Sequence, residues 1–140
     1  MHKTIVVELI RSGFLISDRI ASVVKTEDIT LPQFNVLRIL RGRKGAPASL
    51  NEVKSAMIQP NSNVTRIADK LVDKGLISRK ICPNNKRQIE MLITEKGLNT
   101  LKRLDDQITD AEQNIVNCFS DADKKQFNQY LNQLNLNLKS

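Results

Sequence analysis

The stretch NSNVTRIADKLVDKG, residues 61–75, decides the fold of this chain. Its apolar side chains recur at helical spacing and therefore share one face of a helix. These residues are Val64, Ile67, Ala68 and Leu71. Several polar side chains near Asn61 can cap the start of the helix, and Gly75 is the kind of residue that commonly ends one in the left-handed conformation. The stretch thus predicts a helix of about four turns, from near Asn61 to Lys74, with a polar outer face.

A shorter helix is predicted immediately before this one. Residues 49–52, SLNE, have the form of a capping box. Leu50, Val53 and Met57 follow at spacings that turn them inward, and Pro60 ends the segment. Two short helices separated by a few residues make a helix-turn-helix candidate.

The sequence period changes after Gly75. The spacing of Leu76, Ile77, Arg79 and Ile81 predicts one strand, and the spacing of Ile89, Met91 and Ile93 predicts a second. Pro83-Asn84-Asn85 between them has the chemistry of a hairpin turn, whose tip we place at residues 84–87, NNKR. A basic hairpin directly after a helix-turn-helix is the winged-helix arrangement.

Longer helices are predicted on both sides of this region, because apolar stripes at helical spacing follow capping signals. They run from Lys3 to about Lys25, from the capping box at residues 30–33 to about Lys44, from Thr94 to Phe119, and onward from Ser120. A lobe of about 65 residues cannot bury three long apolar stripes alone, which favours a dimer. The expected fold class is mainly α with a small β-hairpin wing, a winged helix-turn-helix with N- and C-terminal dimerisation helices.

The charge pattern points to a polyanionic partner. The 140-residue chain carries 22 basic and 15 acidic residues, a net charge of +7. The bases gather in the middle of the chain, whereas residues 105–123 hold six acids and no base. No apolar run approaches the roughly 18 to 20 residues of a membrane span, and charges interrupt the N-terminal stretch, so we expect a cytoplasmic protein.

Catalytic and metal-binding patterns are missing from the sequence. The single histidine, His2, and the two cysteines, Cys82 and Cys118, cannot supply the ligands of a zinc site. No poised acid–base pair, Gly-rich phosphate loop or nucleophile motif is present, so we expect neither an enzyme nor a cofactor. We interpret both cysteines first as small apolar side chains and second as thiols that respond to oxidants.

The polar face of the predicted helix over residues 61–74 suits base recognition in a major groove. Arg66 has the donors for a guanine and Asn63 the amide for an adenine, unless residues 61–63 only cap the helix. Lys86 and Arg87 at the hairpin tip can enter a minor groove or lie along phosphates, unless the tip is merely a soluble turn. The candidate DNA-binding residues are Asn61, Ser62, Asn63, Thr65, Arg66, Lys70, Lys86 and Arg87.

Four runs of this sequence resemble the MarR (multiple antibiotic resistance regulator) family of bacterial transcription factors. They are LPQFNVL at 31–37, NVTRIADKLVDKGL at 63–76, Lys86-Arg87, and LITEKG at 92–97, in an order that covers almost the whole chain. The resemblance implies a single MarR-like domain over residues 1–140, with a DNA-binding lobe at 30–94. It also implies a homodimer through residues 1–25 and 95–140 on a pseudo-palindromic operator, and repression relieved by a small organic ligand or by thiol oxidation.

The sequence departs from the family pattern at two points. Asn85 stands where the wing usually carries an acid two positions before the arginine that matches Arg87. No cysteine lies in residues 1–25, where the oxidant-sensing branch has its reactive thiol, so we expect a small, mostly apolar organic effector at a site not yet assigned.

Two alternatives to a ligand-released DNA-binding regulator remain. They are a thiol-based regulator that uses Cys82 and a winged-helix module that binds other proteins and not DNA. A single-strand or RNA binder would need aromatic platforms among its bases, and no aromatic residue lies between Phe34 and Phe119.

Overall fold

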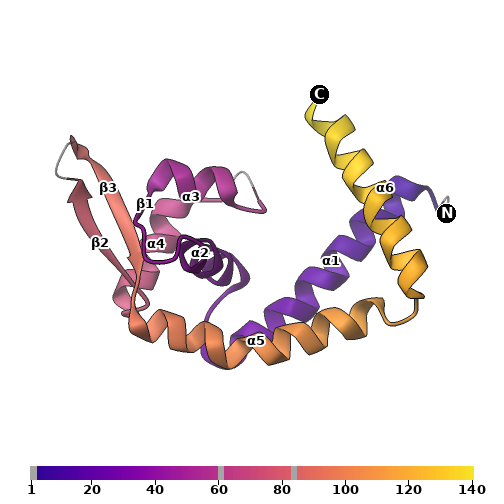
Figure 1. The fold of residues 1–140 in the computed structure, drawn as a ribbon, viewed down its shortest axis with the longest axis horizontal. Helices are drawn as coiled ribbons and strands as arrows, with labels where there is room; N and C mark the ends of the chain where they lie inside the picture. Colours follow the sequence, from indigo (N-terminus) through magenta and orange to yellow (C-terminus); the bar gives the residue numbers. More distant parts are fainter. Residues whose placement is uncertain (1–2, 60–61, 83–84) are drawn as a thin grey trace.

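The computed structural model describes residues 3–59, 62–82 and 85–140, without the side chains of residues 82 and 85–87. In chain order its elements are α1 (Ile5–Val24), η1 (Lys25–Glu27), α2 (Leu31–Gly42), β1 (Ala48–Ser49), α3 (Leu50–Ala56), α4 (Val64–Asp73), β2 (Ile77–Cys82), β3 (Asn85–Ile93), α5 (Glu95–Val116) and α6 (Asp121–Lys139). A lobe built from α2, α3, α4 and the sheet lies at one end of the molecule, and α6 and the N-terminal part of α1 lie at the other (Figure 1). The long helix α5 joins the two ends. The protein is therefore a winged helix-turn-helix, mainly α, as expected.

The helices begin where the sequence offers a capping side chain. Thr30 and Gln33 form a capping box at the start of α2, and Ser49 and Glu52 form another at the start of α3, which confirms both predictions. The N-cap residues of the remaining long helices each accept a hydrogen bond from a backbone N–H three residues on; they are Thr4, Thr94 and Ser120. Helix α2 ends at Gly42, two residues before the predicted end at about Lys44.

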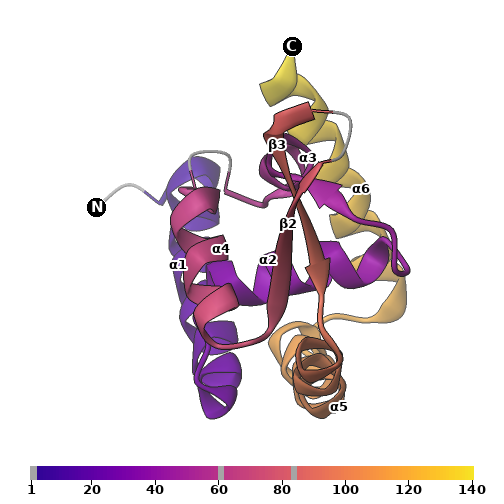
Figure 2. The same ribbon diagram turned by 90° about the vertical axis from the view of Figure 1, so that its left-hand side faces the viewer.

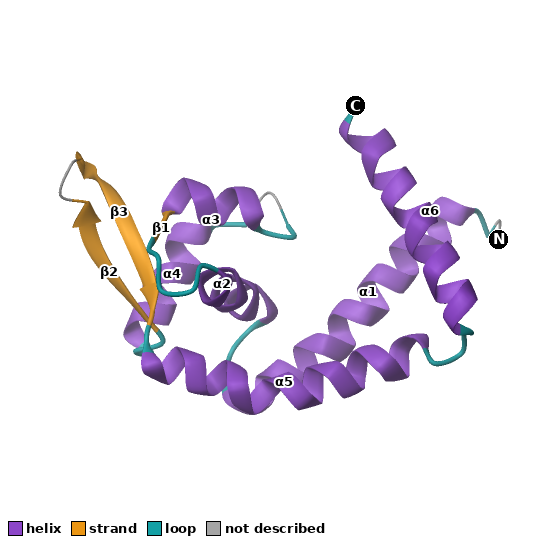
Figure 3. Cartoon of the chain, viewed as in Figure 1, coloured by secondary structure: helices purple, strands orange, loops and turns teal. Residues whose placement is uncertain are grey.

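The sheet has three antiparallel strands in the order β1-β3-β2, and Figure 3 shows how short β1 is beside the other two. The sequence predicted only two of these strands. β1 pairs Ala48 with Met91 and Ser49 with Glu90, and both Ala48 and Met91 are buried. A two-residue strand carries no readable alternation, so only its pairing with β3 identifies it.

The hydrophobic core lies in the lobe and extends along the first half of α5. Its largest fully buried side chains are Leu37, Leu40, Leu71, Met91, Leu101, Leu104, Val24, Val36 and Val53. Two ion pairs add to this packing at the surface. Arg41 of α2 makes a bidentate pair with Asp105 of α5 at 2.9 and 3.0 Å, and Arg103 of α5 binds Glu27 of η1 at 2.7 Å. The lobe is thus attached to α5 by both apolar and charged contacts.

The terminal helices leave many apolar side chains uncovered. Val24 is the one buried residue of α1, and α6 buries none within the described chain. Exposed large apolar side chains on these two helices include Ile5, Val6, Ile10, Phe14, Leu15, Tyr130, Leu136 and Leu138. Monomeric proteins seldom expose so much apolar surface in one region.

In the part of the chain that the structure describes, no helix is both long and apolar enough to cross a membrane.

Candidate nucleic-acid interface

Helix α4 is held in the lobe by one apolar face. Val64, Ala68 and Leu71 are buried in the core, as the helical spacing predicts. The opposite face therefore points to solvent. Its exposed residues are Thr65, Arg66, Asp69, Lys70 and Asp73. Arg66 and Lys70 form no ion pair with any side chain that the structure describes, so both cations are available to an anion.

The start of α4 differs from the sequence prediction. The helix begins at Val64 rather than near Asn61, because Asn63 is its N-cap: the side-chain Oδ1 accepts the backbone N–H of Arg66 at 3.2 Å. Ser62 precedes the cap, and its hydroxyl donates to the carbonyl of Gln59 at 2.9 Å. The amide oxygen of Asn63 thus already accepts a hydrogen bond, so a bidentate contact of this amide with adenine would compete with the helix cap. Asn61 lies outside the described residues.

An ion pair joins α4 to the wing. Arg79 of β2 binds Asp69 of α4 through its Nη1, and both side chains are partly exposed. Figure 2 shows α4 beside β2, with the two strands of the wing crossing in front of the lobe. Sequence reasoning counted these residues only as charges, because their separation of ten positions matches no helical or strand period. The pair neutralises Asp69, one of two exposed acids of α4; the other is Asp73, in the last turn.

The wing itself is built differently from the predicted hairpin. Ile81 pairs with Ile89, but the next pair is Cys82 with Asn85, so residues 86–88 bulge out of the ladder between the two pairs. Lys86 and Arg87 consequently belong to strand β3 and not to a free tip loop, which corrects the predicted tip at residues 84–87. The side chains of Lys86 and Arg87, and the whole of residues 83 and 84, lie outside the description.

A second acid near this surface is also neutralised. The backbone N–H and hydroxyl of Ser49 hydrogen-bond to the Glu52 carboxylate and lower its pKa, and Arg43 beside it at 2.6 Å acts in the same direction. Glu52 lies in the first turn of α3, where the helix dipole favours a negative charge. Among the described residues, no cluster of histidine, cysteine, aspartate and glutamate is suited to holding a metal ion.

A largely apolar cavity of about 580 Å³ lies between α1, α2 and α5, where the lobe meets the terminal helices. Its walls include Ile20, Leu31, Phe34 and Ile108, and the guanidinium of Arg38 lies 5.3 Å from the centre of the Phe34 ring. The sequence analysis predicted no residues for an effector site. The cavity could not be predicted from the sequence, because the residues that line it lie up to 103 positions apart, from Gly13 to Val116.

Comparison with known proteins places this geometry among transcriptional regulators. The model of the MarR family matches residues 29–89. The transcriptional regulator PecS of Dickeya dadantii is 25% identical over 83% of this chain and 70% of its own length. The transcriptional repressor IacR of Pseudomonas putida is 25% identical over 78% of this chain, which spans 64% of IacR, somewhat less than two thirds.

Solved structures share the fold over nearly the full chain. A MarR-like transcription regulator from Bacillus cereus superimposes with a TM-score of 0.84 at 22% identity, covering 94% of this chain and 93% of that one. A cysteine-to-serine mutant of E. coli MarR in complex with operator DNA superimposes with a TM-score of 0.82 at 22% identity, covering 90% and 89%. At these identities the structures establish the fold alone.

Proposed function

We propose that this chain, whose residues 29–89 match the model of the MarR family, is a regulator of that family that binds double-stranded DNA in a sequence-specific manner and regulates transcription. The observation that carries the proposal is the exposed face of α4, where Arg66 and Lys70 have no ion-pair partner among the described side chains and Arg79 of the wing neutralises Asp69. Its apolar face is locked into the core, so the helix presents these groups rigidly. A rigid helix with short polar and cationic side chains fits a major groove.

Each candidate residue has its own proposed role. Arg66 suits the O6 and N7 acceptors of guanine, and the methyl group of Thr65 suits the methyl group of thymine. Lys70 lies one turn further along α4 and suits a phosphate. Lys86 and Arg87 in the wing suit phosphates or a narrow minor groove. Ser62, Asn63 and Asn61 at the start of α4 belong to the same proposed surface, with Asn63 acting mainly through the cap.

The terminal helices are proposed to form a homodimer. Residues 1–25 and 95–140 would make the dimerisation region, and residues 30–94 the DNA-binding lobe. Helix α6 has no extensive contact with any other element that the structure describes, so a partner subunit is needed to cover its apolar face. Two lobes in one dimer can place their α4 helices about 34 Å apart, one turn of DNA, on a pseudo-palindromic operator.

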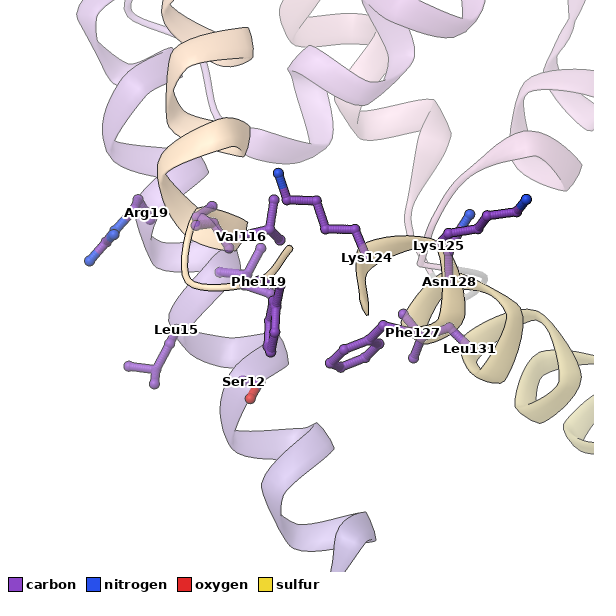
Figure 4. Close-up of a pocket in the computed structure, with 12 residues that line it drawn as sticks. Ser12, Leu15, Arg19, Val116, Phe119, Lys124, Lys125, Phe127, Asn128 and Leu131 are labelled. Carbon is purple, nitrogen blue, oxygen red and sulfur yellow. The ribbon is translucent and has the colours of Figure 1, made fainter. Parts of the chain in front are cut away.

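An apolar pocket within the proposed dimerisation region supports this assignment. Its volume is about 760 Å³, and it is lined by α1, the end of α5 and the start of α6. Figure 4 shows Phe119 and Phe127 there with their rings directed toward one another, and the ring centres are 5.5 Å apart in an edge-to-face arrangement. Both rings are still partly exposed, and a second copy of the chain is the occupant that would cover them.

We expect repression that a small organic ligand relieves. The cavity between α1, α2 and α5 is the proposed effector site, because its apolar walls and Arg38 suit an aromatic acid. A ligand wedged there would alter the placement of the lobe relative to the terminal helices. A coupling of 1 to 3 kcal/mol changes DNA affinity by about 5- to 150-fold, which is enough for a switch.

The function is tested by selecting the bound sequence from a random duplex pool and then comparing variants on it. We expect Arg66→Ala to erode the preference between sequences by about 1 to 3 kcal/mol, and Arg87→Ala to weaken binding to all duplexes. Lys102→Ala on the exposed side of α5 is the control for the loss of one charge. Full affinity and preference in Arg66→Ala would contradict the role of α4, and no duplex binding at all would favour a protein-interaction module.

The effector is tested by a thermal-shift and DNA-release screen with aromatic acids and similar compounds. Peroxide is applied in parallel to the wild type and to Cys82→Ser. Release by an organic compound supports the proposed site. Release by peroxide that disappears in Cys82→Ser, without a response to any organic ligand, would instead identify a thiol switch in the wing.

A further inference from the structure

Lys74, the residue that follows α4, contacts three separate parts of the chain. Its Nζ donates to the backbone carbonyl of Asp28, in the linker between α1 and α2. The same Nζ lies 3.3 Å from Oε1 of Gln33 in α2. Its own backbone carbonyl accepts a hydrogen bond from Nζ of Lys96, in the first turn of α5, at 2.7 Å. The C-terminal end of α4 is therefore bound to every segment through which the lobe connects to the terminal helices.

The partners of Lys74 are themselves held in place. Gln33 is 4% exposed, and its Oε1 also accepts the backbone N–H of Thr30 at 3.1 Å in the capping box. Asp28 has the left-handed backbone conformation, with φ of 57°, which turns the linker sharply at this point. The neighbouring Glu27 is paired with Arg103 of α5. A charged donor that meets two oriented oxygens in such a place makes stronger hydrogen bonds than a neutral one.

The residues after Lys74 are equally constrained. Gly75 has φ of 74°, and its carbonyl accepts the hydroxyl of Thr94, the N-cap of α5, at 2.7 Å. The carbonyl of Leu76 accepts the backbone N–H of Thr94 at 3.1 Å. The end of α4 and the start of α5 are thus joined backbone to backbone, and Lys74 links this junction to the α1–α2 linker, which Arg103 also binds from further along α5.

This junction fixes the C-terminal end of α4, while the core holds its apolar face. The helix has 10 residues, so it is about 15 Å long at 1.5 Å per residue. Because it is anchored at its C-terminal end, a tilt of about 10° there would move its N-terminal end, with the base-reading residues, by about 2.6 Å. That displacement is close to the rise of about 3.4 Å between successive base pairs. A small tilt of α4 at Lys74 therefore moves the base-reading residues by nearly the distance between neighbouring base pairs.

We propose that Lys74 is a positioning residue that fixes α4 relative to both connections of the lobe and so sets the half-site spacing that the dimer accepts. The inference rests on the proposed function, since it presupposes two lobes that read one operator. Lys74 need not touch DNA for this role. Its two hydrogen bonds restrict the distance between the two α4 helices of the dimer, and this distance determines which half-site spacing is preferred.

The experiment uses the full chain and duplexes built from the sequence that the wild type selects. The spacer between the half-sites is set at the selected length, and at one and two base pairs shorter and longer. Affinities are measured for the wild type, Lys74→Met, Lys74→Arg and Lys102→Met. Methionine keeps the apolar stem of Lys74 but lacks the ammonium group that makes both hydrogen bonds. Arginine keeps the charge and hydrogen-bond donors. Lys102 is an exposed lysine of α5, and its substitution controls for the lost charge.

The readout is the ratio of affinities between spacings within one preparation, because a variant that folds incompletely loses the same factor at every spacing. We expect Lys74→Met to reduce the preference for the selected spacing by about fivefold or more, the lower end of typical coupling between sites. Lys74→Arg and Lys102→Met are expected to keep the wild-type ratio. A single half-site duplex should bind wild type and Lys74→Met equally.

Three results would overturn the inference. A spacing ratio in Lys74→Met equal to that of the wild type contradicts the role of Lys74 and leaves the proposed function standing. A wild type that binds all spacings equally contradicts this inference together with the proposed dimeric reading of an operator. An equal change in Lys102→Met would assign the effect to net charge and would also count against Lys74.

Discussion

Arg79 on strand β2 forms an ion pair with Asp69 on the exposed face of α4 and so joins the wing to the helix proposed to enter the major groove. Asp69 lies between Arg66 and Lys70 in the sequence of α4 and is exposed like them, so its charge opposes the approach of phosphates unless it is compensated. Because both partners are partly exposed, the pair adds little to the stability of the fold. Its importance lies in the electrostatics of the DNA-binding face.

Arg79→Gln is expected to weaken duplex binding, and Asp69→Asn to strengthen it. Each effect should reach about fivefold in Kd at low salt, corresponding to about 1 kcal/mol for an exposed charge pair, and should shrink as salt rises. The measurement is fluorescence anisotropy on the selected duplex at two salt concentrations. The double variant Asp69→Asn/Arg79→Gln is expected to lie near the wild type. A double variant that binds clearly more weakly than the wild type would show that Arg79 contacts DNA itself.

Asn63→Ala is expected to lower the free energy of unfolding by about 1 kcal/mol, since it removes the cap of α4. Asn63→Ser keeps an oxygen that can accept the Arg66 N–H and is expected to retain wild-type stability. Urea unfolding at matched protein concentration measures both. The Ser variant also separates the two roles of this residue, because it lacks the amide that would read adenine. A loss of sequence preference in Asn63→Ser at full stability would restore the base-reading role.

Deleting residues 126–140 is expected to convert the dimer into a monomer at micromolar concentration. The deletion removes Phe127, Tyr130, Leu131 and the apolar residues beyond them, several of which are exposed in the single chain. Sedimentation velocity distinguishes the two states. An intact dimer after the deletion would exclude α6 from the interface and leave α1 and α5 as its elements.

Gly97→Ala is expected to destabilise the fold by about 1 to 3 kcal/mol, the usual cost of overpacking. A Cβ at this position would lie 2.3 Å from the backbone carbonyl oxygen of Leu76 and 2.7 Å from Cγ1 of Ile93. The carbonyl belongs to the junction between α4 and α5 and has no room to move. Gly42→Ala is the matched control, because nothing lies within 4 Å of its added Cβ. Equal unfolding free energies for both variants would contradict the close approach.

Most of the helices are predictable because their signals are local. The capping boxes at Thr30 and Ser49 and the apolar stripe of α5 each specify an element from residues within a few turns. The start of α4 was misplaced because several neighbouring polar residues can cap a helix, and only the backbone geometry selects Asn63. The wing tip was misplaced because a bulge leaves no mark in the alternation of residues 85–93.

The exposed cations of α4 follow from the apolar spacing of its buried face, so local sequence was enough to nominate Arg66 and Lys70. The contacts that orient them were not predictable. Asp69 meets Arg79 across the wing, Lys74 reaches Asp28 over 46 positions, and Arg41 reaches Asp105 over 64. Helical and strand periods relate residues within one element, whereas these pairs depend on how separate elements pack. Sequence patterns therefore determine which elements form and which faces are buried, and only tertiary packing decides the direction in which α4 is held.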